Sequence, residues 1–501
     1  MAQVKKNFKL SKNFTYEEMI NSATAKRLNI DNTPSEKELE CLKQLCQNIL
    51  QPIRDKRGSA LTVTSGYRCK KLNKIVGGSA TSQHCFDRNT EILTDNGWKK
   101  IGTIKEWDKP YTYNIEKDRI ELDEIKDIII RPFDGNLYYA KNKHAEYAVT
   151  DEHRMLVRTT QHKYVRTTDR ILTEKEKTYF DTLKTDNDKY HIELAKDVYK
   201  KRRHFKCAAK SAFQNEYNVD MLRLCMAVIS DGFITMKSGM FHGVGFNLVK
   251  ERDKNELEDI LSKLGIPYTV VLSKSHLKLG KDNVYSYFVN SKNAKEVYQI
   301  IGKEKKIPRW FLSLKPEILK ELVITYANFD GTLDNRENCN GITIFSKDEE
   351  NADMLQLMCI FSDMRCVKKT IKNHEIIIGE AHSIIPKFYN LYITTNTDET
   401  RMNENSHKRF YYKGDVWCIT TNNGTVITRR NGKVSIQGNC FGQAADITLG
   451  NPTLNKKLFN MIVEMINKKQ IKVGQLIDEY NYRWLHISLP YTKVNNIIHI
   501  R

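Results

Sequence analysis

Residues 65–84 read SGYRCKKLNKIVGGSATSQH, and residues 440–447 read CFGQAADI. The first stretch ends on His84, the second contains Asp446, and His486 follows near the end of the chain. These are residue types that can bind Zn²⁺. The 355 residues of 85–439 separate the two stretches.

The spacing of these residues becomes regular when this insert is removed. Joining His84 directly to Cys440 puts Asp446 seven positions after His84, with SGYR upstream and Trp484-Leu485-His486 downstream. This joined string resembles the zinc peptidoglycan peptidases, which include D-Ala-D-Ala carboxypeptidases and phage endolysin endopeptidases. The resemblance implies a small α+β peptidase in which His84, Asp446 and His486 bind zinc, with a peptidoglycan stem peptide as substrate.

The resemblance also assigns the chemistry of the peptidase. The zinc ion lowers the pKa of a bound water and polarises the scissile carbonyl. Glu479 takes the general acid/base role because it corresponds to the family's acid upstream of W-x-H, and the neighbouring Asp478 is the alternative. Arg68 stabilises the developing oxyanion or a substrate carboxylate.

The insert carries its own motifs at its two ends. It begins with CFDRNTEILT at Cys85, has a T-x-x-H motif at Thr150 and His153, and ends with VSIQGNC, in which Asn439 precedes Cys440. In this order the motifs resemble those of inteins, whose splicing domain is the all-β, horseshoe-shaped Hint fold. The resemblance implies that the insert excises itself and joins the flanking segments.

Each intein residue then has a chemical task, and splicing needs no cofactor. Cys85 attacks the preceding carbonyl and converts the peptide into a thioester, because nucleophilic catalysis divides one hard step into easier ones. Thr150 and His153 polarise that peptide and protonate its leaving nitrogen. Cys440 captures the acyl group, and Asn439 cyclises through its side-chain amide to release the insert.

Two positions depart from the intein pattern. Gly438 stands where inteins usually have histidine before the terminal asparagine. The proton transfers in the cyclisation of Asn439 therefore need another residue, or the cyclisation is slower. Cys418 stands where many inteins have aspartate, and it is either a further catalytic thiol or a buried structural one. Gly438 also favours the alternative function, a DNA endonuclease or DNA-binding protein that never splices and carries inert peptidase fragments.

The middle of the insert repeats one design. Residues 221–234 contain an apolar helix pattern that ends at Asp231 and a glycine, and residues 322–332 contain a second one that ends at Asp330 and a glycine. This duplication resembles the α+β LAGLIDADG homing endonucleases and implies double-stranded DNA as partner. Asp231 and Asp330 would hold Mg²⁺, which suits carboxylate and phosphate oxygens, with Lys306 as a further catalytic residue between the two units.

Two substitutions affect the expected activity of this endonuclease. Met226 and Thr325 replace the small residue that lets the two helices of the family pack closely. Bulkier side chains at these positions separate the helices and misplace the acids. The sequence therefore predicts an endonuclease that is weakened or inactive.

Composition and charge set the remaining expectations. The net charge is +20, of which the residues outside 85–439 carry +12 and the insert +8, so charge alone does not distinguish DNA from another polyanion such as a wall polymer. No apolar run approaches the roughly 20 residues that span a bilayer, and the start MAQVKKNFKL lacks a signal-peptide pattern. We therefore expect a cytoplasmic monomer in the host cell of a phage or prophage, with the spliced peptidase reaching the wall after lysis or from the virion.

Together the motifs predict a multidomain α+β chain in five segments. Within the first segment, Ser35 and Glu38 have the spacing of a capping box and predict a helix start. The predicted boundaries are 1–84 and 440–501 for the peptidase, 85–214 and 396–439 for the Hint domain, and 215–395 for the endonuclease.

Overall fold

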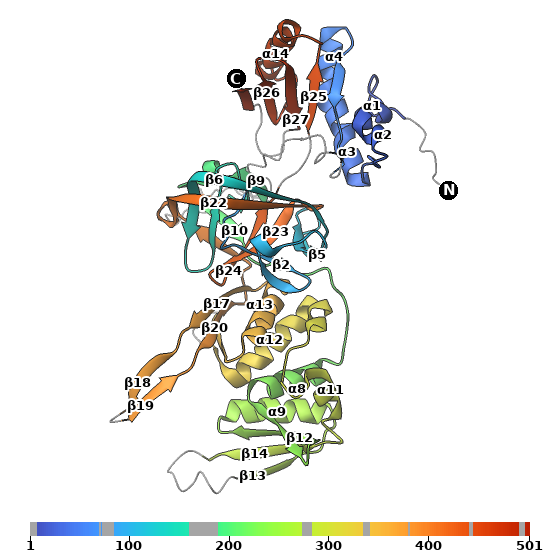
Figure 1. Ribbon diagram of the computed structural model, residues 1–501. Helices are drawn as coiled ribbons and strands as arrows, with labels where there is room; N and C mark the ends of the chain where they lie inside the picture. The colour runs from blue at the N-terminus through green and yellow to red at the C-terminus, as the bar shows by residue number, and fades with distance from the viewer. Residues whose placement is uncertain are drawn as a thin grey trace, which may run out of the picture.

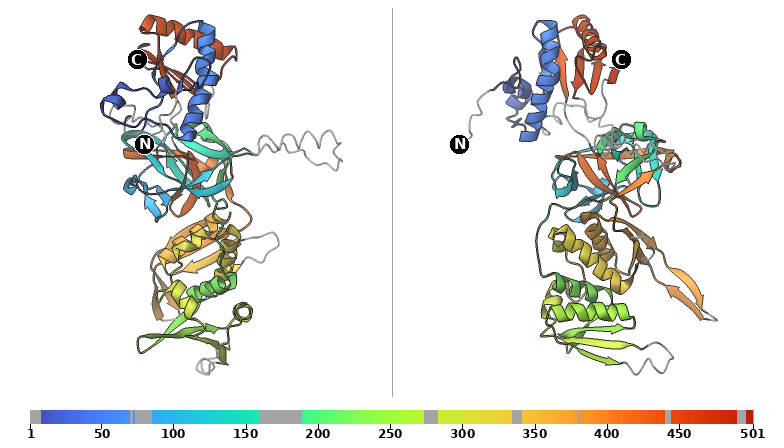
Figure 2. Two further views of the ribbon diagram at one scale, coloured as in Figure 1. Left: turned by 90° about the vertical axis from the view of Figure 1, so that its right-hand side faces the viewer. Right: turned by 180° about the vertical axis from the view of Figure 1, so that it is seen from behind.

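The computed structural model describes residues 8–69, 72, 85–159, 189–272, 283–333, 341–378, 381–439, 444–489 and 496–500. These residues form a mixed α+β structure with several sheets, none of which closes on itself within the described ranges. Figures 1 and 2 show the elements stacked along one long axis, with the first and last elements of the chain together at one end. The mixed α+β class predicted from the sequence is confirmed at this level.

The terminal region comprises the described residues of 1–84 and 440–501. Its strands form a five-stranded sheet in the order β1-β25-β27-β26-β28, so a strand from before the insert pairs with a strand from after it. The elements are α1 (Tyr16–Ile20), α2 (Ala23–Arg27), α3 (Glu36–Leu45), η1 (Cys46–Leu50), α4 (Gln51–Arg57), β1 (Thr62–Ser65), β25 (Ala444–Thr448), α14 (Pro452–Asn467), β26 (Gln475–Glu479), β27 (Trp484–Ser488) and β28 (Asn496–Ile500).

The terminal region has one hydrophobic core built from both ends of the chain. Antiparallel pairing of β1 with β25 places Thr62 opposite Thr448 and Val63 opposite Ile447. Buried residues on both sides of the insert pack together, and the core contains none of the described residues of 85–439. The helix start predicted at Ser35 is confirmed, because the Ser35 and Glu38 side chains make a reciprocal capping box at α3. Members of this core include Met19, Leu45, Ile53, Leu61, Ile447, Ile462, Leu485 and Ile487.

The central region comprises the described residues of 85–439, and its β-rich part comprises those of 85–214 and 396–439. Two long antiparallel strands, β6 and β22, cross this part from one side to the other (Figure 1). The elements are β2 (Glu91–Thr94), β3 (Gly97–Lys100), η2 (Ile101–Thr103), β4 (Tyr111–Asn114), β5 (Arg119–Leu122), β6 (Ile125–Lys141), β7 (Glu146–Val149), β8 (Arg154–Arg158), β9 (His191–Leu194), α7 (Ala195–Val198), β10 (Arg203–Lys206), β21 (Glu399–Met402), η4 (Glu404–Ser406), β22 (His407–Thr421), β23 (Thr425–Arg430) and β24 (Lys433–Gly438).

The helical part comprises the described residues of 215–395. It repeats the order helix, two strands, helix and two further strands, and the hairpin β18–β19 extends outward from β17 and β20 (Figure 2). The elements are α8 (Val219–Ser230), β11 (Gly232–Lys237), β12 (Met240–Leu248), α9 (Glu251–Lys263), β13 (Thr269–Leu272), β14 (Tyr285–Asn290), α11 (Lys295–Ile301), η3 (Arg309–Ser313), α12 (Pro316–Asp330), β15 (Gly331–Leu333), β16 (Gly341–Ser346), α13 (Glu349–Phe361), β17 (Arg365–Ile371), β18 (His374–Ile378), β19 (Ala381–Ile385) and β20 (Phe388–Thr394).

The β-rich and helical parts share one sheet and one core. The sheet has the order β15-β16-β20-β17-β24-β23-β2-β3, and the amide N–H of Lys368 in β17 donates to the carbonyl of Gly432 beside β24 at 3.0 Å. A single hydrophobic cluster joins Leu93, Ile427 and Ile436 of the β-rich part to Met226, Leu319 and Leu357 of the helical part. The two parts therefore pack as one body. No helix among the described residues is long and apolar enough to cross a membrane.

Candidate functional site

The first residue of the central region is held by the T-x-x-H turn. Cys85 is fully buried, and its backbone N–H donates to Thr150 Oγ1 at 2.9 Å. The backbone N–H of Thr150 donates in return to the carbonyl of Cys85 at 3.0 Å. The first bond holds the N–H of the peptide on the amino side of Cys85, which the sequence predicts to be cleaved, and the second holds the peptide that follows Cys85. His84, which precedes Cys85, lies outside the described residues.

His153 is positioned at the same junction. Its ring centroid lies 4.3 Å from that of Phe86 in an edge-on arrangement, and its backbone N–H donates to the carbonyl of Thr150 at 3.1 Å. Phe86 is in turn tied to β22, because its backbone N–H and C=O both bond Trp417. The structure therefore brings Cys85, Thr150 and His153 together, as the sequence motif requires.

Asn439, the last residue of the central region, is also fully buried. Its carbonyl oxygen accepts a hydrogen bond from Arg154 Nη1 at 2.7 Å, and its side-chain Nδ2 donates to Thr421 Oγ1 at 2.9 Å. Its backbone N–H donates to the carbonyl of Gly424 at 3.0 Å. Main chain and side chain of Asn439 are thus both held, and Cys440, the next residue, lies outside the described residues.

Gly438 lies against the backbone of Arg154. A Cβ atom built at Gly438 would lie 2.8 Å from Arg154 Cβ and 2.9 Å from the Arg154 carbonyl oxygen. Real Cβ atoms do not approach neighbours that closely, so any side chain here would push β24 away from the start of β8. The absence of a histidine at this position therefore has a steric cause.

Cys418 lies in the same buried cluster as Cys85, on β22 opposite Ile129 of β6. Its Sγ is 3.6 Å from the carbonyl oxygen of Ile419. The neighbourhood is apolar, with Leu137 and Val416 among its members. This position is compatible with both roles considered for Cys418, a catalytic thiol close to the junction and a buried structural one.

Two of the three predicted zinc ligands lie side by side in the terminal region. Asp446 of β25 pairs across the sheet with His486 of β27, and His486 Nδ1 is 2.9 Å from Asp446 Oδ1. Histidine nitrogen and carboxylate oxygen are donors that suit Zn²⁺, and both side chains are partly exposed. Within the described ranges no group of three or more His, Cys, Asp and Glu side chains is arranged around a common point, and the third predicted ligand, His84, lies outside them.

Strand register separates the two candidates for the general acid/base. Glu479 pairs with Trp484, two residues from His486 on the same strand, so Glu479 lies on the face of the sheet that carries His486. Asp478 pairs with Leu485, which belongs to the hydrophobic core, and is itself buried. Arg68 follows β1 in the sequence. The register therefore favours Glu479 over Asp478.

The two predicted magnesium ligands lie close together at the ends of α8 and α12. Burial, together with the nearby carboxylate of Asp330, raises the pKa of Asp231 to about 6. Burial also raises the pKa of Asp330. Two partly buried carboxylates, one of which disfavours the charge of the other, form a site that a divalent cation would stabilise.

Lys250, Lys305 and Lys347 all lie near enough to act on the charges of these acids. Lys305 Nζ donates to the carbonyl of Gly232 at 2.7 Å, and both carboxylates act on its charge. The predicted Lys306 instead pairs with Asp348 at 2.5 Å and with Glu350 at 3.2 Å. The structure thus brings Lys305, which the sequence interpretation passed over, to the acidic pair.

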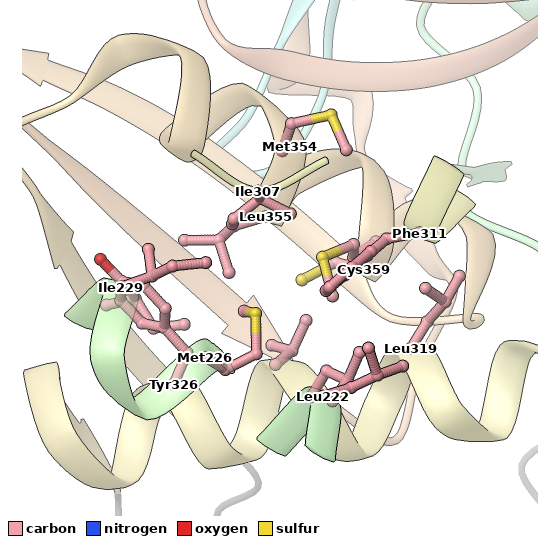
Figure 3. Close-up of a cluster of buried hydrophobic side chains, with 14 of the residues drawn as sticks. Leu222, Met226, Ile229, Ile307, Phe311, Leu319, Tyr326, Met354, Leu355 and Cys359 are labelled. Carbon is pink, nitrogen blue, oxygen red and sulfur yellow. The ribbon is translucent and has the colours of Figure 1, made fainter. Parts of the chain in front are cut away.

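The two helices that carry the acids pack directly against each other. Met226 and Thr325, which replace the small residues of the resembling family, are both buried. Figure 3 shows Met226 of α8 beside Tyr326 of α12 in the shared core. The bulk of Met226 is therefore accommodated by packing, and the carboxylates at the helix ends remain close enough to interact.

Comparisons with known proteins match different parts of the chain. A Peptidase M15 family model matches residues 12–117, a stretch that begins in the terminal region and continues past Cys85. The chain is similar to the ribonucleoside-diphosphate reductase subunit beta of Aquifex aeolicus (strain VF5), with 24% identity over 406 residues that cover 78% of this chain and 55% of that protein. The chain thus spans about half the length of the curated relative that it matches.

Similar solved structures fall into two groups. One is the AceL NrdHF class 3 split intein, with a TM-score of 0.23, 7% identity, and coverage of 72% of this chain and 99% of that chain. The other includes full-length DUF199/WhiA from Thermatoga maritima, with a TM-score of 0.24, 14% identity, and coverage of 37% and 54%. I-DmoI in complex with DNA and Mn has a TM-score of 0.23, 12% identity, and coverage of 35% and 90%. TM-scores this low do not establish a common fold, so the proposals below rest on the geometry of the chain.

Three residues of these sites were not found from the sequence: Arg154, Thr421 and Lys305. Arg154 immediately follows His153, so its position next to the histidine predicted to be catalytic was a signal that could have been used. Thr421 and Lys305 had no such signal, because their contacts depend on which strands and helices meet in space.

Proposed function

We propose that the chain is an intein precursor whose central region excises itself and joins the two flanking segments. The observation that carries this proposal is that one short stretch of chain holds both ends of the central region. Thr150 binds the amide of Cys85, and Arg154 binds the carbonyl of Asn439. The flanking segments already meet in one sheet through β1 and β25, so joining them completes a unit that is otherwise formed.

At the amino end, the thiol of Cys85 attacks the carbonyl of the preceding residue. The carbonyl–sulfur bond forms, the peptide C–N bond breaks, and the amine of Cys85 leaves with a proton. Thr150 Oγ1 orients the scissile amide, since it accepts its N–H at 2.9 Å. His153 is the proton donor, held by its edge contact with Phe86.

At the carboxyl end, Cys440 takes the acyl group from the thioester and Asn439 then cyclises. The acyl group passes from one sulfur to the other, and attack by the Asn439 side-chain amide on its own carbonyl releases the central region. A final shift of the acyl group from sulfur to nitrogen leaves an ordinary peptide bond between His84 and Cys440. Splicing needs no external cofactor or energy source.

The similarity to the reductase subunit supports the proposal that residues 85–439 are an insert that occurs in more than one protein. The terminal segments hold 146 residues, so an alignment that covers 78% of the chain has to lie mostly within 85–439. The relative's name denotes a ribonucleotide reductase subunit, whereas the family match at the start of this chain is to a peptidase. A shared central sequence in two unlike settings is expected of a self-excising insert.

We propose that the joined product is a zinc peptidoglycan peptidase of a phage or prophage, made in the host cell and acting on the wall after lysis or from the virion. His84, Asp446 and His486 would bind Zn²⁺, which when bound supplies an activated water and a polarised carbonyl. Glu479 would move the proton and Arg68 would bind the oxyanion or a substrate carboxylate. The facing pair Asp446 and His486 supports this proposal.

The precursor itself is expected to bind zinc poorly, because His84 is bonded to Cys85, which is buried in the central region. Zinc content measured on a Cys85→Ala, Asn439→Ala precursor and on the spliced product tests this directly. We expect about one zinc per spliced chain and a small fraction of that in the precursor. Equal zinc content with equal wall hydrolysis in both forms would contradict it.

The helical part is proposed to be a LAGLIDADG-type DNA endonuclease domain within the released central region. Asp231 and Asp330 would bind Mg²⁺ between them and the scissile phosphates of double-stranded DNA, and the raised pKa of Asp231 supports this site. Lys305 lies nearer to these acids than Lys306 does, because Lys306 pairs with Asp348 and Glu350. The proximity of the two acids supports retained metal binding despite Met226.

The splicing proposal is tested by intact mass of the freshly expressed chain beside the Cys85→Ala, Asn439→Ala variant. Splicing predicts two products, a joined chain of 146 residues and a free chain of 355 residues, both absent from the variant. Full-length chain alone in both samples would instead support the alternative, a DNA-binding protein or endonuclease that carries inert peptidase fragments.

A further inference from the structure

The turn between β26 and β27 runs through three residues in the left-handed region. Tyr480, Asn481 and Tyr482 have φ values of 51°, 56° and 65°, which side chains other than glycine rarely adopt. Backbone of this kind persists only where its surroundings hold it, and it gathers at ligand-binding sites. The turn lies between Glu479, the proposed general acid/base, and β27, the strand that carries a proposed zinc ligand.

Two contacts hold the inner side of this turn. Asn455 of α14 is fully buried, and its Nδ2 donates to the carbonyl oxygens of Tyr482 at 2.9 Å and Arg483 at 3.0 Å. The ring of Tyr482 packs edge-on against that of Phe459, with 5.5 Å between the ring centroids. Tyr482 is thereby directed toward the hydrophobic core of the terminal region. The turn is anchored to α14, the helix that contributes Phe459 to this core.

The outer side of the turn presents two aromatic rings in contact. Tyr480 is 60% exposed, and its ring centroid lies 5.2 Å from that of Trp484 at an interplanar angle of 49°. A single exposed aromatic side chain is ordinary, because more than half of a protein surface is apolar. Two rings in contact, one of them on an anchored turn, instead form a fixed apolar surface. We call Tyr480 and Trp484 the aromatic platform.

Strand register places the aromatic platform on the face of the proposed zinc site. Along β27, Trp484 and His486 are partly exposed, whereas Leu485 and Ile487 belong to the core. Alternate residues of a strand share a face and lie about 7 Å apart. Trp484 therefore lies beside His486, which in turn pairs with Asp446. The platform is continuous with the two proposed zinc ligands that the structure describes.

We propose that the aromatic platform is a binding subsite for the sugar rings of the wall glycan, next to the peptidase site. The proposal rests on the proposed peptidase function, because it concerns the direction in which the same substrate extends from the zinc ligands. The stem peptide of peptidoglycan consists of small and charged residues, whereas the pyranose rings of the glycan have flat apolar C–H faces. Tyrosine and tryptophan combine an apolar ring with a hydrogen-bonding group, which suits the apolar face and hydroxyl edge of a sugar.

The stem peptide has other partners on this side of the molecule. Its carboxylates suit the positive charge of Arg68 and of a bound metal ion, both of which the proposed function already assigns. Tyr480 and Trp484 carry no formal charge at neutral pH, so they add nothing to the binding of a carboxylate. The two parts of the substrate are thus bound by groups of different chemistry.

Trp484 is itself a probe of this subsite. It is the only tryptophan in residues 1–84 and 440–501, so the tryptophan fluorescence of the joined chain comes from the platform alone. The joined chain is obtained by splicing, or by direct expression of 1–84 fused to 440–501, whose described core is complete without the central region. Soluble glycan strands, released from cell walls by an amidase, are the first ligand, and the free stem peptides from the same digestion are the second.

We expect glycan strands to shift the Trp484 emission to shorter wavelength in a saturable way, because a bound sugar excludes water from the indole. Free stem peptides at the same concentration are expected to leave the emission unchanged. A response to stem peptides but not to glycan strands would overturn the proposal, because it would assign the platform to the peptide. Absence of any response in a joined chain that cleaves cell walls would also overturn it, while leaving the peptidase function intact.

Tyr480→Ala removes one ring and leaves the reporter in place. We expect the Kd for glycan strands to rise roughly 3- to 10-fold, as is typical for the loss of an aromatic contact. Tyr480→Phe keeps the ring and should bind within about 2-fold of wild type. Phe8→Ala is the matched control, because Phe8 is an exposed aromatic of the same region whose stacked partner, Tyr16, lies in α1. An unchanged Kd for Tyr480→Ala would contradict the proposal.

Hydrolysis separates the subsite from the peptidase site. Tyr480→Ala is expected to raise the KM for intact cell walls and to leave kcat for free stem peptides unchanged, since uniform binding acts on KM alone. Equal losses on both substrates would overturn the proposal, because Tyr480 would then act at the peptide. A joined chain that binds glycan strands but cleaves neither substrate would support the subsite and contradict the proposed peptidase function.

Discussion

The chain has two internal boundaries, and they are built in opposite ways. At the outer boundary, between the terminal and central regions, the hydrophobic core of the terminal region draws on none of the described residues of 85–439. At the inner boundary, between the β-rich and helical parts, strands β17 and β24 lie in one sheet and a single core joins both parts. The terminal and central regions can separate without exposing the hydrophobic core of the terminal region, whereas separating the β-rich and helical parts would expose the core that they share.

This difference matches what splicing demands of each boundary. The outer boundary has to open once the bonds at Cys85 and Asn439 are exchanged, and a direct contact across it is the surface pair of Lys126 with Glu38 at 3.4 Å. The inner boundary would stay closed in the proposed excised product. It is held by charge pairs such as that of the buried Arg429 with the half-buried Asp353 at 2.5 Å. The contacts at the outer boundary are therefore weak, and those at the inner boundary are strong.

The largest expected effect comes from cutting the chain at each boundary. Residues 1–84 fused to 440–501 contain their whole described core and are expected to unfold cooperatively on heating. When a short Gly-Ser linker replaces 215–395, the central region is expected not to unfold cooperatively, because Leu93, Ile427 and Ile436 lose packing partners. Each loss costs about 2–5 kcal/mol, whereas the typical free energy of unfolding of a whole domain is about 5–15 kcal/mol. Circular dichroism melting curves distinguish them, and a shortened central region with a cooperative, unchanged transition would contradict the shared core.

The next largest loss of stability is expected from adding a single methyl group at the inner boundary. A Cβ at Gly432 would lie 1.8 Å from the Lys368 carbonyl oxygen, and Gly432 has φ +74°, so Gly432→Ala is expected to destabilise the chain by at least about 3 kcal/mol. Gly239→Ala is the matched control, because Gly239 has φ +80° but open space around it, and should cost only about 1 kcal/mol. Equal losses in thermal stability for the two variants would show that β17 does not press on β24.

A pH dependence is expected from Glu399, whose side-chain partners all lie within the β-rich part rather than across the inner boundary. Burial alone raises the pKa of Glu399, but hydrogen bonds from His204, Arg158 and Tyr190 outweigh it and lower the pKa to about 2. A lowered pKa in the folded state gives stability that is present above the unfolded value, near 4.5, and is lost as pH falls toward 2. We expect Glu399→Gln to be less stable by about 2–3 kcal/mol at pH 7 and to lose less stability than wild type between about pH 4.5 and 3. Parallel stability curves would contradict the assignment.

The smallest expected effect is at the outer boundary. Lys126 and Glu38 are both partly exposed, with side chains 29% accessible, and such pairs contribute about 0–1 kcal/mol. Lys126→Ala should therefore change thermal stability by less than about 1 kcal/mol and leave the splicing yield unchanged. A loss as large as that of Gly432→Ala would mean that the two boundaries are not built differently.

Much of this arrangement was predictable from local sequence. The Ser35 and Glu38 capping box spans four consecutive residues, and Thr150 of the T-x-x-H turn binds the backbone N–H of Cys85. The closeness of Asp446 and His486 was expected from the resemblance of the joined string to a family in which both are ligands of one metal.

The rest depended on contacts between distant strands. The bond from Arg154 to Asn439 exists because β8 lies against β24, and the sheet that joins β17 to β24 pairs segments with no common pattern. Lys305 lies beside the acids whereas Lys306 pairs with Asp348 and Glu350, and which lysine does which depends on how the helices pack. Gly438, interpreted from the sequence as a defect, fits closely against Arg154 for a reason that only the packing reveals.

The most direct test of splicing is a tryptic peptide map of the expressed chain. Splicing predicts a peptide in which residues 75–84 are bonded directly to residues 440–456, with the sequence IVGGSATSQHCFGQAADITLGNPTLNK. Detecting that peptide by tandem mass spectrometry, and losing it in the Cys85→Ala, Asn439→Ala variant, is the result expected here. A map that contains only the uninterrupted peptides 75–88 and 434–456, in wild type as in the variant, would contradict the account.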